Sequence, residues 1–494
     1  MQELNQNDKN EGVLSKSIKG GKWLTIGYTI QKLLSLASFI VLARFLRPAD
    51  FGVMAIILAI PKFLESATDT GFGSSIIQKE GEITRYLNPI WTIGVIKSII
   101  IMALVFISGP YIANFFQTEV AVLAIQLGGV FIVIQNLFNI GETFLFKEMD
   151  FKKIIIRNVL RDIVYILVGI SIALFWKSYW ALFFATIASY ATQTISTYFL
   201  HPYRPRLSLS FGKLKDLFNY SKWIIGQTWI TQLYGLMETS ILARLTNITS
   251  LGLYTKAKNM AAIAPGFIGP TIQTISFPAY SKIQKDTEKI NEGLIKSMQI
   301  VSFLLIPATS LILLAGGKII LIILGQDWLG MTNILRVMLI FFFIAVINDI
   351  LYSLFNAIGY PDKQVKVNLI KIIITLPLLI YFTSKFGAIG ASFALLVGIV
   401  PITALNLLNV ARLTKARVRD ILGTIIIPLV ASIILVIPAL IYKDYILQLP
   451  AIILFSLALI AAILYYSMIF LTDKMWNKGP YKTVRLIIRH NLKI

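Results

Sequence analysis

The stretch that decides the fold is KWLTIGYTIQKLLSLASFIVLARFLRPADFG at residues 22–52, which recurs as KWIIGQTWITQLYGLMETSILARLTNITSLG at residues 222–252. The offset is 200 residues at every matched position, from the Lys-Trp pair through Leu-Ala-Arg to the final glycine. Both copies contain an apolar run long enough to cross a membrane. A chain that repeats a membrane helix and its following turn halfway along is predicted to consist of two homologous lobes.

The composition is that of a membrane protein. The 494 residues are 56% hydrophobic and 14% charged, with a mean hydropathy of +0.76, whereas soluble domains carry about 25% charged residues. The chain has no cysteine, which excludes disulfides, iron–sulfur clusters and cysteine nucleophiles. Because it has only two histidines, His201 and His490, we expect no histidine-based metal site. We also expect no cofactor.

The apolar segments predict an all-α, polytopic integral membrane protein of about fourteen transmembrane helices, each near the ~20 residues that a bilayer requires. We expect two pseudo-symmetric six-helix lobes and a C-terminal helix pair. The expected spans are 22–44, 53–77, 88–110, 119–143, 158–176, 179–200, 221–243, 256–281, 296–316, 333–356, 366–384, 388–410, 423–442 and 449–471. The expected divisions are a cytoplasmic tail (1–21), a first lobe (22–210), a second lobe (211–410), the helix pair (411–471) and a basic cytoplasmic tail (472–494).

The positions of Lys and Arg orient these spans. Connections on the side of the N-terminus, such as the turns 144–161 and 201–222, hold about three times as many cations as those on the other side. The positive-inside rule therefore predicts that both termini are cytoplasmic. Most of the net charge of +22 is then explained by cations in the cytoplasmic connections, where they contact anionic lipid headgroups. It does not indicate nucleic-acid binding. Six spans separate the two copies of the repeat, so the lobes are parallel.

Several ionisable side chains fall inside the spans, where they usually face a cavity or a partner. Lys62, Glu65 and Asp69 share one helical face because they are spaced i, i+3 and i+7. A Lys62–Glu65 pair would leave Asp69 without a partner, which favours a hydrated cavity. Lys97 could equally snorkel to an interface or line a cavity, and Arg44 and Arg244 could be interfacial anchors or flank the outer mouth of a cleft. The candidate cations are Lys32, Lys62, Lys97, Arg44 and Arg244, and the candidate carboxylates are Glu65, Asp69, Glu142, Glu238 and Asp349.

The connections resemble, in order, those of bacterial polysaccharide exporters. The similarity extends over about residues 15–400 and is closest to the lipopolysaccharide/teichuronic acid exporter branch of the multidrug/oligosaccharidyl-lipid/polysaccharide superfamily. The segments that carry it are Arg47–Gly52, Asp69–Gly73, Met149–Lys153, Tyr203–Arg206, Leu251–Tyr254, Phe277–Ala279, Gly325–Trp328 and Gly359–Asp362.

That resemblance implies a V-shaped pair of lobes whose first, second, seventh and eighth helices line a central cleft. It implies a transporter, not an enzyme, that flips undecaprenyl-diphosphate-linked oligosaccharide from the inner to the outer leaflet of the bacterial cytoplasmic membrane by alternating access. The cations would bind the diphosphate, and the carboxylates would couple or gate transport, with a proton or Na⁺ as the coupling ion to consider. The implied partners are this lipid-linked substrate, membrane lipids and, transiently, polysaccharide polymerase and assembly proteins.

Two other functions stay open from the residues. A small-molecule, cation-coupled (MATE-like) efflux antiporter could share the architecture, although lysines within the first three spans favour an anionic substrate. An integral-membrane glycosyltransferase or polysaccharide polymerase would need a catalytic acid or base, usually on a long outer loop. The outer connections here are short, which disfavours that reading.

Overall fold

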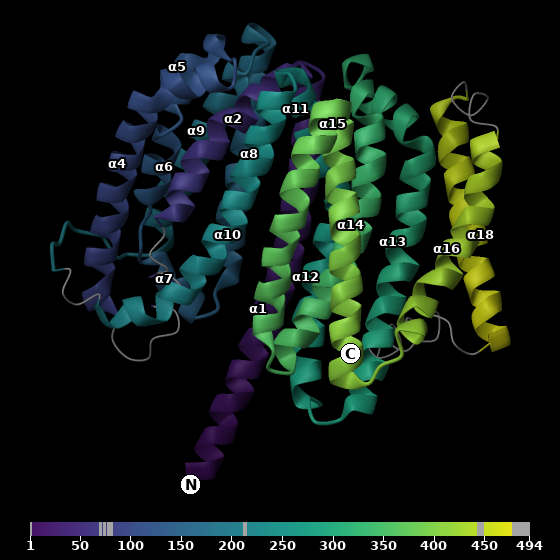
Figure 1. The fold of residues 1–494 in the computed structure, drawn as a ribbon. Helices are drawn as coiled ribbons and strands as arrows, with labels where there is room; N and C mark the ends of the chain where they lie inside the picture. The colour runs from purple at the N-terminus through teal and green to yellow at the C-terminus, as the bar shows by residue number, and fades with distance from the viewer. Residues whose placement is uncertain are drawn as a thin grey trace. The chain divides into compact units, whose positions relative to one another are not determined.

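The computed structural model describes residues 2–68, 72, 76, 83–210, 215–441 and 449–476. Every element within these residues is a helix, as Figure 1 shows. Eight segments of the described part are long and apolar enough to cross a membrane. The prediction of an all-α, polytopic membrane protein is confirmed, while the number of fourteen spans stays a prediction.

The chain divides into two compact units, residues 1–252 and 253–494. The lobe boundary near residue 210 and the other predicted divisions stay predictions. The first unit contains α1 (Gln2–Ala43), α2 (Pro48–Ala67), α4 (Thr84–Phe115), η1 (Glu119–Ala121), α5 (Val122–Leu127), α6 (Val130–Asn136), α7 (Glu142–Lys147), α8 (Phe151–Trp176), α9 (Trp180–Leu200), α10 (Lys215–Leu245) and the start of α11 (Ile248–Ala261).

The expected span 119–143 is not one continuous helix. It is divided into η1, α5, α6 and the first two residues of α7, with Gly128 and Gly129 between α5 and α6. A Cβ added to Gly129 would lie 2.6 Å from the Cα of Met102, so α4 passes too close for any side chain at this position. The close approach of α4 explains why glycine stands at this break.

Within the first unit, α1 packs along α8, and α8 packs along α9. Gly27 of α1 lies directly against Ile155 of α8, where an added Cβ would meet the Ile155 side chain at 2.5 Å. Small residues at helix crossings let backbones approach closely in membranes, where apolar side chains gain little by leaving lipid. The α2 helix lies nearer the centre of this unit than α1 does, because it contacts four helices, α4, α6, α9 and α10.

The glycines that end the two copies of the repeat contact each other's turns. A Cβ on Gly52 would lie 2.1 Å from the carbonyl oxygen of Ile248, and a Cβ on Gly252 would lie 1.8 Å from that of Pro48. The same Cβ on Gly252 would be 3.0 Å from the backbone nitrogen of Gly52. The start of α2 and the start of α11 therefore meet backbone to backbone, and only glycine fits on either side.

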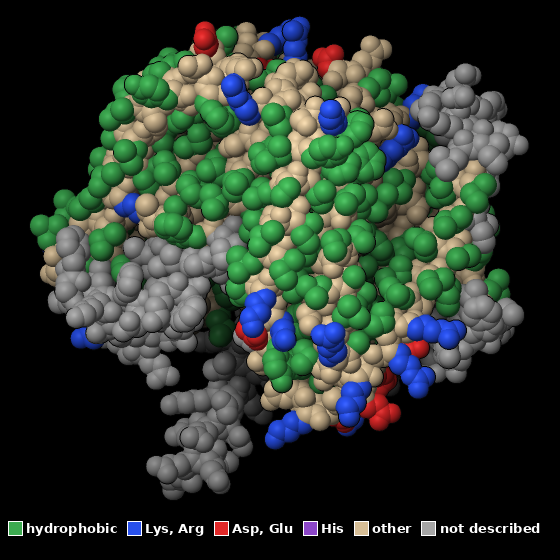
Figure 2. Space-filling model, in the orientation of Figure 1, with side chains coloured by type: hydrophobic (Ala, Val, Ile, Leu, Met, Phe, Trp, Pro, Cys, Tyr) green, Lys and Arg blue, Asp and Glu red, His purple; other side chains and the backbone are tan. Residues whose placement is uncertain are grey.

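The second unit contains the rest of α11, α12 (Ile263–Lys282), α13 (Thr287–Ile323), η3 (Gln326–Met331), α14 (Thr332–Ala357), α15 (Pro361–Thr414), α16 (Val418–Ile441) and α18 (Ala451–Trp476). Its core lies mainly between α13 and α14, with Met298, Leu305, Leu351 and Phe355 almost fully buried. Figure 2 shows a band of hydrophobic side chains over α15, with Lys and Arg gathered towards its ends, as a bilayer requires.

The long α15 segment is two helices joined at Gly387. This residue has φ +61° and ψ −142°, outside the helical region, and the chain reverses there. Glycine adopts positive φ without the steric cost that a Cβ would bring. The two parts, 361–386 and 388–414, contain the spans expected at 366–384 and 388–410.

Candidate functional site

The structure describes nine of the ten candidate residues; Asp69 lies outside the described residues. Eight of the nine belong to the first unit: Lys32, Arg44, Lys62, Glu65, Lys97, Glu142, Glu238 and Arg244. Asp349 belongs to the second unit. The candidate charges are thus concentrated in one half of the chain.

Two lysines of the first unit are exposed on apolar helices. Lys32 lies on α1 together with the exposed Tyr28 and Ser35, at spacings i, i+4 and i+7. This exposed face turns away from Gly27, which packs against α8. Lys62 is exposed on α2, one turn before the half-buried Glu65. A lysine exposed at membrane depth is costly in lipid, so these ammonium groups are candidates for contact with water or an anionic ligand.

Glu65 points to a different environment from its neighbour Lys62. Asn136, the last residue of α6, donates a hydrogen bond from Nδ2 to Glu65 Oε1 at 3.3 Å. Leu64 packs against Ile101 and Val105 of α4 and Ile132 of α6. Glu65 therefore lies where α2 meets α4 and α6.

Lys97 lies on the face of α4 that packs on these helices. Gly94, one turn earlier, is so close to α6 that an added Cβ would lie 3.1 Å from Asn136 Oδ1. Ile101, one turn later, belongs to the cluster around Leu64. Half-buried between these two levels, Lys97 belongs to the same region of the unit as Glu65.

This region continues onto α8 and α9 through groups that the sequence did not single out. Tyr190 of α9 is close enough to both Glu65 and Arg161 to interact with them electrostatically. Arg161 forms an ion pair with the adjacent Asp162, with 2.7 Å between Nη2 and Oδ1. Five helices, α2, α4, α6, α8 and α9, thus contribute to one polar region inside the first unit.

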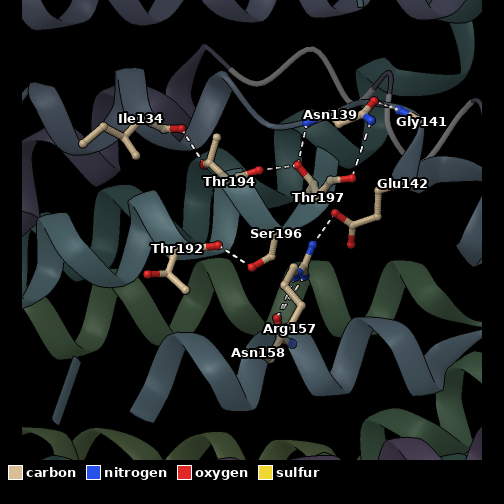
Figure 3. Close-up of polar contacts among 10 residues, drawn as sticks. All are labelled: Ile134, Asn139, Gly141, Glu142, Arg157, Asn158, Thr192, Thr194, Ser196 and Thr197. Atoms are coloured by element: carbon tan, nitrogen blue, oxygen red, sulfur yellow. Dashed lines mark hydrogen bonds and ion pairs between the residues drawn. The ribbon is translucent and has the colours of Figure 1, made fainter. Parts of the chain in front are cut away.

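Glu142 has a direct partner within the protein. It is the first residue of α7 and forms a buried ion pair with Arg157 of α8, shown in Figure 3. The Arg157 guanidinium also donates two hydrogen bonds to the Asn158 side chain, from Nε at 3.2 Å and from Nη2 at 2.9 Å. Both ion-pair side chains are more than nine-tenths buried. This pairing ties α7 to α8 and gives Glu142 a structural role.

A neutral hydrogen-bond network lies beside this ion pair (Figure 3). The Asn139 backbone N–H donates to the hydroxyl of Thr197 at 2.8 Å, and its Nδ2 donates to the carbonyl oxygen of Tyr203 at 2.6 Å. Tyr203 donates its hydroxyl to Asn88 of α4 at 2.7 Å. The network fastens the segment after α9 to the start of α4.

His201 belongs to the same network. The Tyr203 backbone N–H donates to His201 Nδ1 at 3.1 Å, and the imidazole stacks on Phe144 with 4.9 Å between ring centroids. Burial lowers the pKa of His201 from its usual 6.5, opposed by the nearby Glu148 carboxylate. An Nδ1 that accepts a hydrogen bond must be unprotonated, so the contact needs the neutral ring.

The remaining first-unit candidates lie at helix ends or in the interior. Arg44 is exposed directly after α1. Arg244, in the last turn of α10, donates from Nη1 to the Phe115 carbonyl oxygen at 3.2 Å and lies over the Phe115 ring. Since Phe115 ends α4, this arginine caps a helix C-terminus, a favourable place for a cation. Glu238 of α10 is buried, with 4% exposure.

Asp349 occupies a separate polar region in the second unit. It lies on α14, near Gly269 of α12 and within electrostatic range of Lys371 of α15. The adjacent Asn348 donates to Thr403 at 2.7 Å and accepts from Asn406 at 2.7 Å. These contacts tie α14 to the second half of α15.

Sequence reasoning missed Asn136, Asn139, Arg157, Arg161 and Tyr190. Arg157 and Arg161 belong to the connection expected at 144–161, which is helical from Phe151 on and carries both in the first three turns of α8. Asp150 followed by an apolar-periodic run is a helix-start signal for this earlier beginning. Asn136, Asn139 and Tyr190 are uncharged, so nothing in the sequence marks them as site residues. Their role depends on which helices pack together.

A family model described as polysaccharide biosynthesis protein matches residues 41–333. The chain is 25% identical to the lipopolysaccharide biosynthesis protein WzxC of Escherichia coli K12, over 77% of this chain and 78% of that protein. It is 21% identical to the teichuronic acid biosynthesis protein TuaB of Bacillus subtilis 168, over 71% and 73% of the two chains.

Among solved structures, the fold is similar to the lipid II flippase MurJ in an inward closed conformation, with a TM-score of 0.72 and 16% identity over 91% of this chain and 99% of that one. At this identity the likeness concerns the fold. The expected resemblance to bacterial polysaccharide exporters is confirmed by the family match and the relatives. Because the family match spans more than half of its residues, the chain belongs to the polysaccharide biosynthesis protein family.

Proposed function

We propose that this chain is a transporter that flips an oligosaccharide linked to undecaprenyl diphosphate from the inner to the outer leaflet of the bacterial cytoplasmic membrane by alternating access. The observation that carries the proposal is the exposure of Lys32 and Lys62 on two apolar helices of the first unit. A diphosphate needs cations along its path, and lysine binds phosphate as a point charge. The step makes and breaks no covalent bond.

Family membership and the names of the relatives support this substrate class. One relative is named for lipopolysaccharide biosynthesis and another for teichuronic acid biosynthesis, and both products are assembled from sugars. The neighbour with the similar fold is named as a flippase of lipid II. A flippase moves the lipid and its attached sugar together across the bilayer. A chain made of membrane-spanning helices can provide the path for this movement.

The proposal assigns different roles to the candidate charges. Lys32 and Lys62 contact the diphosphate, together with the half-buried Lys97. Glu65, half-buried beside Asn136 where α2 meets α4 and α6, is the carboxylate that takes up a coupling proton or Na⁺. Glu142 and Arg244 are structural, since each has a protein partner.

The test is a flipping assay with purified protein in liposomes that contain an undecaprenyl-diphosphate oligosaccharide. The wild type should move the lipid to the opposite leaflet, where an added glycosidase or lectin can reach it. Lys62→Ala should slow transport roughly ten- to hundredfold, since a charged hydrogen bond contributes about 1.5–3 kcal/mol. Lys62→Arg should restore most of the rate because it keeps the positive charge.

The matched control is Lys285→Ala, which removes a lysine exposed in the turn between α12 and α13. This variant should transport like the wild type. Full activity of Lys62→Ala would remove Lys62 from the mechanism. Wild-type liposomes that extrude lipophilic cations and leave the lipid-linked sugar in place would instead support the efflux antiporter.

A further inference from the structure

A cavity of about 470 Å³ lies within the second unit, between α13, the start of α14, α16 and α18. Its volume is within the ~300–1,000 Å³ that single-ligand sites occupy. The helix pair α16 and α18 packs against α13 and lies together at one end of this unit (Figure 1). The proposed transport function gives no role to these two helices.

The cavity is built by regular helical faces with small residues. On α18 the lining residues Leu454, Leu457, Ala461 and Tyr465 recur at i, i+3, i+7 and i+11, which is one face of a helix. Ala458 and Ala462 fill the gaps in this stripe. Alanines where larger apolar side chains would close the space leave room for an occupant.

Both cationic residues of the lining lie towards the same end of the cavity. Lys318 is near the end of α13, and Arg336 is near the start of α14. Arg336 donates from Nε to the Leu313 carbonyl oxygen at 2.9 Å and from Nη1 to Asn333 at 3.1 Å, which uses two of its five donors. The described lining contains no Asp or Glu, so this end attracts an anion.

Two hydroxyls in the lining are buried donors that the protein does not use. Ser432 of α16 and Tyr465 of α18 are 3% and 0% exposed, and neither hydroxyl makes a hydrogen bond in the described part of the chain. A buried hydroxyl without a partner costs free energy. Both hydroxyls lie towards the end of the cavity opposite Lys318, because Tyr465 and Ala431 pack with Phe303, one turn before Pro307 on α13.

We propose that this cavity binds one anionic phospholipid. Its phosphate lies at Lys318 and Arg336, and an acyl chain extends from there through the apolar space between α13 and α18 towards Ser432 and Tyr465. Pro307 and Lys318 both line the cavity. They are eleven residues apart on α13, which is about 16 Å along the helix, so the cavity is long enough for much of an acyl chain. The lipid thereby fastens α16 and α18 to α13.

The experiment is a lipid titration of the full chain, purified in detergent and followed by native mass spectrometry. The probes are phosphatidylglycerol, phosphatidylcholine, undecaprenyl phosphate and inorganic phosphate. We expect one phosphatidylglycerol to bind at least tenfold more tightly than phosphatidylcholine. The double variant Lys318→Gln/Arg336→Gln should lose this preference. Ala461→Trp, which fills the cavity, should lose the bound lipid.

Ile463→Trp is the matched control, because Ile463 lies on the exposed face of α18 and outside the lining. It should bind lipid like the wild type.

Bound phosphatidylglycerol should also raise the midpoint of thermal unfolding in the wild type and the Ile463 variant only. Unchanged binding in both the charge variant and Ala461→Trp would overturn the proposal. So would displacement of phosphatidylglycerol by undecaprenyl phosphate or by inorganic phosphate at equal concentration. Since binding and not transport is measured, these outcomes are independent of the flipping assay.

Discussion

At the scale of single residues, the charges inside the first unit fall into two groups. Glu142 is enclosed and paired with Arg157, while Lys32 and Lys62 are exposed on their helices. Burial without a partner is expensive for an ionised group, so the enclosed pair is tied to the stability of the fold. The exposed lysines can exchange one anionic partner for another, which is what a transport path requires.

Breaking the Glu142–Arg157 pair should destabilise the protein strongly. Arg157→Met leaves a buried carboxylate without its cation, which costs about 3–5 kcal/mol. The double variant Glu142→Gln/Arg157→Met removes both charges and should recover most of that loss. Thermal unfolding in detergent measures both effects, and a double variant no more stable than Arg157→Met would contradict this account of the pair.

His201 should make the segment after α9 sensitive to acid. Its pKa in the folded protein is below 6.5 because burial favours the neutral ring. The stabilising contribution is therefore present above pH 6.5 and is lost as the pH falls through the folded-state pKa. Protonation of Nδ1 also removes the acceptor for the Tyr203 N–H.

The check is thermal unfolding at pH 7.5 and pH 5. His201→Asn keeps an acceptor near Nδ1 but cannot titrate, so its unfolding midpoint should fall less than that of the wild type on acidification. Equal falls in the two proteins would show that another group titrates.

At the scale of elements, the contact between α2 and α11 depends on a missing side chain on both sides. Carbonyl oxygens lie where a Cβ would stand on Gly52 and on Gly252, at 2.1 Å and 1.8 Å. Real Cβ atoms do not approach so closely, and a backbone obstacle cannot rotate away as a side chain can. The turn of the repeat is thus fixed by the contact between its two copies.

Gly252→Ala should separate these helix starts and lower stability by several kcal/mol, because overpacking a tight contact costs about 1–3 kcal/mol or more. Gly235→Ala on α10 is the matched control, since nothing lies within 4 Å of the added methyl. There alanine should be neutral or slightly stabilising. Unfolding midpoints and the yield of folded protein distinguish the two, and equal behaviour would refute the close crossing.

At the scale of the whole molecule, both termini are expected on the cytoplasmic side of the membrane. The chain has no cysteine, so each introduced cysteine reports its own position. The exposed Val120 precedes α5, at an expected outer end, and the exposed Lys285 lies in an expected cytoplasmic turn. Labelling at Val120 tests the expected outer side of the membrane, and labelling at Lys285 tests the expected cytoplasmic side.

In intact spheroplasts, Val120→Cys should react with a membrane-impermeant maleimide, and Lys285→Cys should react only after the cells are opened. Labelling is followed by the mass of the modified chain. The reverse pattern would invert the proposed orientation of the transporter and the direction assigned to flipping.

The sequence by itself determined the class of the protein. Apolar runs near membrane thickness, a charged fraction of 14% and a repeat at a constant offset require a helical membrane protein, because hydrogen-bonded helices satisfy the backbone in lipid. From the apolar runs it also predicted individual elements such as the two parts of α15, expected at 366–384 and 388–410, which the structure joins at Gly387. The exporter-like turns predicted the family, which the match over residues 41–333 confirmed.

Only the tertiary structure decided which charges have partners. Glu142 and Glu65 look alike as carboxylates inside apolar segments, yet one meets Arg157 and the other meets Asn136. Partners arise where helices distant in the chain pack together, and a one-dimensional pattern carries no record of that packing. The cavity between α13 and α18 is likewise a product of tertiary packing. It forms where the alanines of α18 are too small to fill the space between this helix and α13, α14 and α16.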